Sequence, residues 1–172
     1  MSGCPYKNFK SKVYSFLNIL RKPRKEYSGF APCPFVGAEI DQDKLMIELF
    51  DPSKNSILDM VKRLEASKHE SALLVQVSGE DLNSADTYKY QVFLNGLLRT
   101  NGFKHFKCIC LTPKDNFDVG GFSIRQNSPY FLINITRRDL LAKTHEKLLK
   151  TKYFDNMSQE YLDYLQVKKE KK

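Results

Sequence analysis

Apolar residues recur every three to four positions in several segments of the chain, which is the pattern of amphipathic helices. The first such segment runs from Asn8 to about Leu20, and Pro23 ends it because proline cannot continue a helix. A second begins at Asp51-Pro52, where Asp51 is expected to be the N-cap and Pro52 to occupy the first turn. Three more helices are predicted around residues 90–98, over 139–151 and over 158–167.

Four short runs rich in β-branched and aromatic residues predict strands over residues 44–50, 72–77, 106–111 and 130–135. The first three alternate with helices, which favours parallel strands joined by right-handed crossovers. The loop from Pro113 to Ser128 is long enough to permit either direction of the last strand. The pattern therefore predicts an α/β fold: a four-stranded mixed, mostly parallel sheet with helices packed against it and extra helices at both ends.

A chain of 172 residues with 41 % apolar residues is expected to form one soluble domain. Within it, residues 1–30 are predicted to form a basic helix and linker, residues 31–151 the α/β core, and residues 152–172 a helix and basic tail. No apolar run reaches the ~18 residues of a membrane-spanning helix, and Met1–Pro5 lacks the basic and apolar regions of a secretory signal. We therefore expect a cytoplasmic protein without a membrane partner.

The net charge of +8 is concentrated at the two ends of the chain. Residues 1–30 carry seven Lys/Arg and one acid, and residues 137–172 carry ten Lys/Arg and six acids, whereas residues 31–136 carry eleven Lys/Arg and thirteen acids. Basic ends serve as solubilising tails, bind nucleic acid or dock a protein partner, and all three alternatives stay open. The nucleic-acid alternative rests on Lys7, Lys10, Arg21, Lys22, Arg24 and Lys25, with Tyr6, Phe9, Tyr14 and Tyr27 interleaved among them.

None of the four cysteines, Cys4, Cys33, Cys108 and Cys110, has the Cys-x-x-Cys spacing of zinc or redox sites. Cys33 lies between two prolines in a rigid loop, which makes it a weak candidate for a catalytic nucleophile; a buried structural cysteine is the alternative. Cys108 and Cys110 alternate on a predicted strand and are expected to share one buried face. The sequence predicts no metal site and no cofactor, and Gly120-Gly121 lacks the Lys-Ser/Thr of a phosphate-binding loop.

Residues 120–138 combine a glycine pair, a polar loop, a proline and an apolar strand, and they hold most of the candidate chemistry. Asn134 is the only strongly polar residue of the predicted strand, so its amide needs partners if the strand is buried. The arginines and polar side chains around the strand are donors that suit a carboxylate or phosphate. The alternative is an ordinary loop that enters a core strand. The candidate ligand-binding residues are Cys33, Arg125, Asn127, Ser128, Tyr130 and Arg137.

Two short motifs, Cys33-Pro34-Phe35 and Ser128-Pro129-Tyr130, carry a resemblance to a known family. Over about residues 31 to 150, the chain resembles an uncharacterised bacterial family that is known only as a domain of unknown function. Arg137 matches the arginine that ends a strand in that family, while Thr112 and Asn134 stand where the family has histidines. The resemblance implies no reaction, and the acid–base chemistry of the missing histidines does not carry over.

The leading hypothesis is a pocket for a small anionic ligand, formed by the Cys33 loop, the Thr112–Phe117 loop and the Arg125–Tyr130 loop. An accessory nucleic-acid-binding protein is the first alternative, and an adaptor whose terminal helices dock a protein partner is the second. The sequence leaves open whether the chain is an enzyme and what its oligomeric state is.

Overall fold

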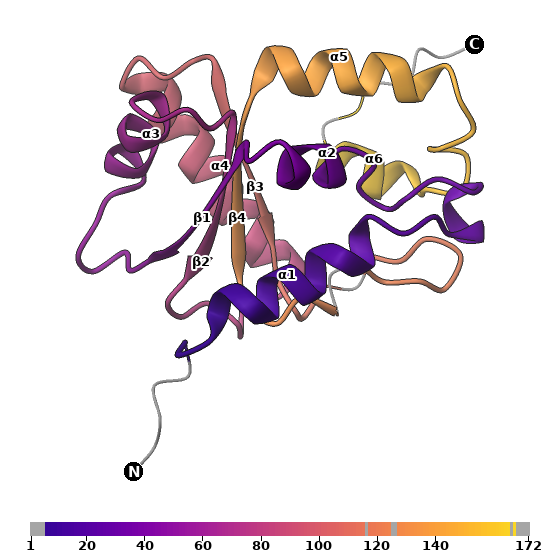
Figure 1. Cartoon of the computed structure of the whole chain (residues 1–172), viewed down its shortest axis with the longest axis horizontal. Coiled ribbons are helices and arrows are strands. Elements are labelled where there is room, and N and C mark those ends of the chain that lie inside the picture. Colours follow the sequence, from indigo (N-terminus) through magenta and orange to yellow (C-terminus); the bar gives the residue numbers. More distant parts are fainter. Residues whose placement is uncertain (1–5, 116, 125–126, 166, 168–172) are drawn as a thin grey trace.

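The structure, a computed structural model, describes residues 6–115, 117–124, 127–165 and 167. In this part of the chain, six α-helices surround one four-stranded sheet and form a single α/β domain (Figure 1). The helices are α1 (Phe9–Leu20), α2 (Val36–Asp41), α3 (Ile57–Glu65), α4 (Ser84–Thr100), α5 (Arg138–Leu149) and α6 (Gln159–Leu165). The strands are β1 (Leu45–Phe50), β2 (Ser71–Gln76), β3 (Phe106–Leu111) and β4 (Leu132–Arg137).

The sheet has the strand order β1-β2-β4-β3, and only the first of its three pairs is parallel. β4 runs antiparallel to both β2 and β3, so β1, β2 and β3 all point in the same direction. The prediction of a mixed four-stranded sheet is confirmed, but the prediction that the sheet is mostly parallel is wrong. The reason is the position of β4. The long loop before it allows β4 to insert between β2 and β3, so these two strands, which run in the same direction, are not paired with each other.

Alternate residues of each strand point to opposite faces of the sheet, and each face has its own apolar core. Figure 1 shows α3 and α4 on one face, and α1, α2, α5 and α6 on the other. On the second face, α1 buries four apolar residues, among them Val13 and Phe16, and α6 buries Tyr161 and Leu162. Helices from both ends of the chain thus belong to this core, and the domain boundaries at residues 30 and 151 stay a prediction.

β3 is an edge strand whose outer backbone groups are bound by side chains from α4 and α6. Asn95 donates through Nδ2 to the carbonyl oxygen of Cys108 at 2.8 Å and accepts the N–H of Cys108 at 3.0 Å. Gln91 accepts the N–H of Cys110 at 2.8 Å, and the Tyr164 hydroxyl donates to the carbonyl oxygen of Cys110 at 2.7 Å. These bonds replace those of a neighbouring strand. They satisfy backbone N–H and C=O groups of β3 that would otherwise be free to pair with a strand of another chain.

Two local predictions are wrong. The sequence predicts a loop up to Gly37, whereas α2 begins at Val36. The N-cap of α3 is Ser56 and not Asp51: the Ser56 hydroxyl accepts the N–H of Asp59, and the Asp59 carboxylate accepts the N–H of Ser56. The Asp51 carboxylate instead accepts two bonds from Ser53, because the residues after the proline form a separate turn before the helix starts.

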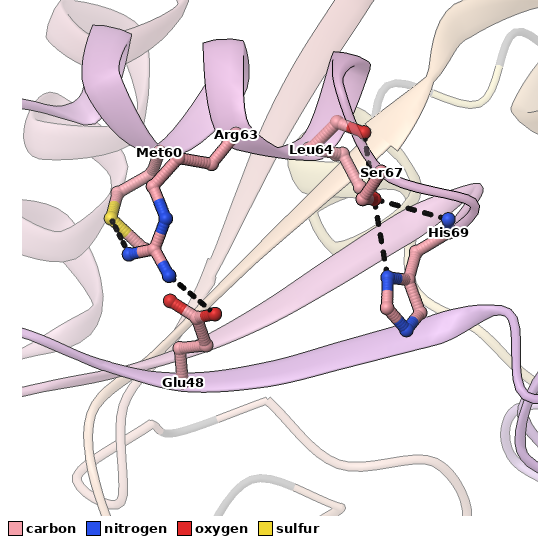
Figure 2. A network of polar contacts seen from close by, with 6 residues as sticks. All are labelled: Glu48, Met60, Arg63, Leu64, Ser67 and His69. Atoms are coloured by element: carbon pink, nitrogen blue, oxygen red, sulfur yellow. Dashed lines mark hydrogen bonds and ion pairs between the residues drawn. The ribbon is translucent and has the colours of Figure 1, made fainter.

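Polar contacts connect α3 to β1 and to the turn that leads into β2 (Figure 2). Arg63 donates to the Glu48 carboxylate at 2.8 Å. Ser67 donates to the carbonyl oxygen of Leu64 at 2.8 Å and accepts the backbone N–H of His69 at 3.1 Å. The ring Nδ1 of His69 also lies 3.1 Å from the Ser67 hydroxyl, so both the backbone and the side chain of this histidine contact Ser67 within the turn.

Candidate functional site

The loop that precedes β4 uses its predicted site residues in contacts within the protein. Ser128 is buried, and its hydroxyl donates to the carbonyl oxygen of Tyr130 at 2.6 Å. Asn127 is exposed and donates to the carbonyl oxygen of Ser123 at 2.8 Å. Tyr130 is buried near the N-terminal end of α1. These contacts shape the loop, and Arg125 lies outside the described residues.

Arg137 lies at the opposite end of β4 from this loop. From Leu132 to Arg137 the strand covers about 17 Å at roughly 3.3 Å per residue, too far for one small ligand to contact both ends. The exposed Arg137 guanidinium donates through Nε to Asp139 at 3.2 Å. An exposed pair of this kind contributes at most about 1 kcal/mol to stability. The structure therefore does not bring Arg137 together with Ser128 and Tyr130.

Cys33 and Tyr130 lie near opposite ends of α1. The N–H of Cys33 donates to the carbonyl oxygen of Leu20 at 2.9 Å, whereas the Lys12 ammonium lies 5.7 Å from the centre of the Tyr130 ring. Lys12 and Leu20 are separated by about 12 Å along the helix axis. Burial raises the pKa of the Cys33 thiol to about 11, and the negative charge of Glu39 adds to the shift. The thiol is therefore protonated at neutral pH and is a poor nucleophile in that form.

Cys33 lines a cavity of about 200 Å³ between the sheet and helices α1, α2, α5 and α6, and we refer to it as the Cys33 cavity. None of the other predicted ligand-binding residues that the structure describes lines it. The polar part of the wall includes Glu39 of α2, Asn134 of β4, and Thr144 and His145 of α5. Most of the wall is apolar and includes Phe16, Leu17, Phe35, Leu73, Ile109, Leu141 and Leu148.

Two neighbouring rows of side chains cross the sheet on the face of this cavity. The pairing of the strands defines them as Ile47–Leu73–Asn134–Ile109 and Leu45–Ser71–Thr136–Lys107. The first row is apolar apart from Asn134. The second row is polar at three of its four positions, although Ser71, Thr136 and Lys107 are only 1 %, 8 % and 4 % exposed. A buried polar row thus borders an apolar cavity.

Lys107 is the charged member of the polar row. Its Nζ lies 3.5 Å from one acceptor, the carbonyl oxygen of Leu165, and Leu165 lines the cavity. Within the described part of the chain, Lys107 forms no ion pair. Burial lowers the pKa of its ammonium from the ordinary 10.5 to about 8, and the positive charge of Arg138 lowers it further. A buried ammonium with a single long hydrogen bond is costly, because it has lost its water without gaining full replacement.

His145, Glu39 and Tyr153 also line the cavity and have shifted pKa values, and burial raises the pKa of the Tyr153 hydroxyl. Burial lowers the pKa of His145 to about 4, and the charge of Lys107 contributes, so the imidazole is neutral at pH 7. Burial raises the pKa of Glu39, while a hydrogen bond from Ser71 at 3.0 Å opposes the shift. His145 therefore offers the cavity a neutral donor and acceptor.

The cysteines of β3 face the opposite core. Cys108 and Cys110 are fully buried on the face covered by α3 and α4, as their alternation predicts. Burial raises the pKa of Cys108 to about 12, so this thiol is protonated as well. Cys4 lies outside the described residues. Across the residues that are described, no three His, Cys, Asp or Glu side chains are grouped to hold a metal ion.

The basic residues of the nucleic-acid alternative lie on α1 and beside its two ends. Arg21 pairs with Asp41 at 3.5 Å, and the Arg24 guanidinium lies over the ring of Phe122 at 3.5 Å. Of the four interleaved aromatic residues, Tyr14 is exposed and the other three are buried or partly buried. The lysines of this set are exposed and form no ion pair within the described part of the chain: Lys7, Lys10, Lys22 and Lys25.

Sequence reasoning singled out Cys33 and Asn134 but missed three further residues in or beside the cavity. Lys107 carried a usable signal, because Ile109 and Leu111 follow it at two-residue spacing and must point to the same face of the strand. Glu39 and His145 carried none, because Glu39 lies in a segment for which no helix was predicted and His145 lies among ordinary polar residues of a helix. Their position at the cavity depends on how the helices pack on the sheet.

Comparison of the chain with protein-family models, with curated proteins and with solved structures finds no match. The resemblance to the bacterial family stays a prediction. Within the described residues, no helix combines the length and apolar character needed to cross a lipid bilayer. The candidate function therefore depends on the geometry of the Cys33 cavity.

Proposed function

We propose that the chain binds a small organic ligand with an apolar body in the Cys33 cavity. The observation that carries the proposal is the cavity itself, about 200 Å³ of space against an apolar core, with half-buried residues such as Phe35 and His145 in its wall. Protein interiors are close-packed and contain few voids larger than a water molecule, because the lining of a void loses its packing contacts. A void of this size, lined from all four strands and four helices, is the arrangement expected of a ligand site.

The volume limits the ligand to about one ring with a substituent. A void of about 150 Å³ lined by Leu, Ile and Phe binds benzene. Pockets for drug-sized ligands are larger, at about 300–1,000 Å³. The Cys33 cavity, at about 200 Å³, is closest to the first case. Monocyclic aromatic compounds and short aliphatic compounds are therefore the ligands to expect.

The wall suits an apolar body with one or two polar substituents. Cys33 presents a protonated thiol, Asn134 an amide and His145 a neutral imidazole, and each of them recognises a substituent by hydrogen bonding. The arginines that the sequence suggested for an anion lend no support, because Arg137 lies at the far end of β4 and Arg125 lies outside the described residues. The proposed function is thus ligand binding, and no reaction is assigned to it.

Neutral compounds and a cavity-filling variant test this function. Benzamide and hexanamide at millimolar concentration should raise the melting temperature of the wild type, because a ligand that binds only the folded state stabilises it. Thr144→Phe directs a ring into the cavity from α5 and should abolish the effect. Ala142→Phe adds the same ring to an exposed position of α5 and should retain it. Absence of stabilisation in the wild type, or equal stabilisation of both variants, would contradict the proposal.

A second candidate function, nucleic-acid binding, is favoured by the charge around α1. Residues 6–25 contain seven Lys/Arg and no acid. Such a surface attracts the phosphate backbone, with an affinity that falls steeply as salt is added. Fluorescence anisotropy with single-stranded and duplex DNA and RNA, at several salt concentrations, tests this candidate. Lys10→Glu and Lys22→Glu should weaken binding for every sequence, and a wild type that binds none of the probes even at low salt would exclude it.

A further inference from the structure

We propose that the ligand of the Cys33 cavity is a small monocarboxylate whose carboxylate binds Lys107 while its apolar body fills the cavity. The inference rests on the function proposed above, and it adds the chemical class of the ligand. It also assigns a role to a buried lysine that the sequence did not single out. Aromatic acids with one ring and short-chain aliphatic acids belong to this class.

Lys107 does not line the cavity itself, but it lies beside two residues of the wall, Ile109 and Leu165, and has unused donors. It precedes Ile109 by two residues and shares its face of β3, and Ile109 lies in the cavity wall. The acceptor found for Lys107 Nζ, the carbonyl oxygen of Leu165, lies at 3.5 Å, beyond the usual hydrogen-bond range. An ammonium has three donors, so at least two remain. Because Lys107 is 4 % exposed, bulk water has little access to them.

The charges around Lys107 favour an anion. Arg138 faces it with a like charge, and His145 on α5 is neutral. From α6 it meets the backbone carbonyl of Leu165. The Glu39 carboxylate accepts a hydrogen bond from Ser71 on β2. Ser71 lies two strands, or about 10 Å, from Lys107 across the sheet. A carboxylate placed beside Lys107 would offset the repulsion from Arg138 and give the ammonium its missing partner.

Asn134 gives a second, independent indication of a missing partner. Its side chain lines the cavity, and its Oδ1 is buried and accepts no hydrogen bond from any described residue. Asn134 and Lys107 are diagonal neighbours on β4 and β3, a relation that places two residues about 7–8 Å apart. A ligand whose carboxylate contacts Lys107 therefore places its adjacent atoms near the Asn134 amide. A hydroxyl group on the neighbouring carbon would donate to Oδ1.

Matched pairs of acids and amides test the inference by isothermal titration calorimetry. Benzoate and benzamide have nearly the same shape and differ in charge, as do hexanoate and hexanamide. Near pH 7, we expect the wild type to bind each acid about tenfold to a hundredfold more tightly than its amide, as a charged hydrogen bond allows. The preference should disappear at about pH 9.5, where an ammonium with a pKa of about 8 has lost its proton.

A pair of variants separates Lys107 from the general basicity of the chain. Lys107→Met has a side chain only one atom shorter and without charge, so this variant should bind acids and amides equally. Lys104→Met removes an exposed charge three residues earlier and should keep the preference of the wild type. If Lys107→Met does not fold, the comparison of the two pH values in the wild type decides.

The outcomes distinguish the two proposals. If neither acids nor amides bind, the proposed function fails. If amides bind as tightly as acids near pH 7, ligand binding stands and the carboxylate inference is wrong. If Lys107→Met keeps the preference for acids, a group other than Lys107 binds the carboxylate, and the inference is again wrong.

Discussion

Replacing Lys107 by an apolar residue of similar length should stabilise the folded chain at neutral pH. In the folded chain the pKa of its ammonium is about 8, against an ordinary value of 10.5. At about 1.4 kcal/mol per pKa unit, this difference costs about 3 kcal/mol of unfolding free energy. Lys107→Met keeps the packing of the aliphatic stem and removes the charge, so it should gain about that amount near pH 7.

The gain should depend on pH in a direction that follows from the lowered pKa. Because the unfolded chain binds this proton more tightly than the folded chain, the cost is fully present below about pH 8. It shrinks as the pH rises through the folded pKa and is gone near pH 10.5, the ordinary lysine value. Arg138 and His145, which face Lys107, are present in both proteins, so the difference between wild type and variant isolates the lysine.

Urea unfolding of the wild type, Lys107→Met and Lys104→Met over this pH range measures the effect. All ionisable groups other than the substituted lysine are shared by the three proteins, so their contributions cancel in the comparison. Lys104 is exposed, so its variant should follow the wild type closely. A Lys107→Met variant that is no more stable than the wild type near pH 7, or one whose gain persists unchanged to high pH, would refute the reasoning.

Three further substitutions or reactions test other parts of the structure. Asn95→Leu should lower the unfolding free energy by about 3 kcal/mol in urea titrations, because a buried N–H and C=O of β3 lose their partner, whereas the exposed Asn101→Leu should cost far less. Equal losses would mean that Asn95 does not protect the edge. Ser56→Ala should cost about 1 kcal/mol as the loss of an N-cap, and Ser53→Ala less, and the reverse order would restore Asp51 as the helix start. At neutral pH, Cys33 should react with iodoacetamide at a rate at least about tenfold lower than that of free cysteine, as followed by mass spectrometry. An equal rate would show that the thiol is ionised.

The directions of the first three strands follow from the sequence, because each helix between them has to return the chain to the start of the sheet. Which strands lie next to each other in the sheet does not follow from the sequence. β4 pairs with β2 and β3 through contacts between residues far apart in the chain, such as Leu73 with Asn134. Nothing local to residues 130–135 indicates that they insert into the middle of the sheet and not at its edge.

The candidate site was predictable in part. The polar Asn134 in an apolar strand predicted an amide that needs partners, whereas its Oδ1 has none among the described residues. The distance between Tyr130 and Arg137 also follows from the sequence, since an extended strand advances about 3.3 Å per residue and separates its two ends. The approach of Lys107 to His145 depends on how α5 crosses the sheet, which apolar periodicity does not specify.

Methyl NMR spectra recorded during a titration with benzoate test most directly whether the Cys33 cavity binds a ligand. We predict saturable shift changes at the methyl groups of Leu73 and Ile109, which lie in the cavity wall. The methyl groups of Leu74 and Ile133, in the core on the opposite face of the sheet, should not change. Saturable changes at both pairs, or at neither pair, would contradict the proposed site.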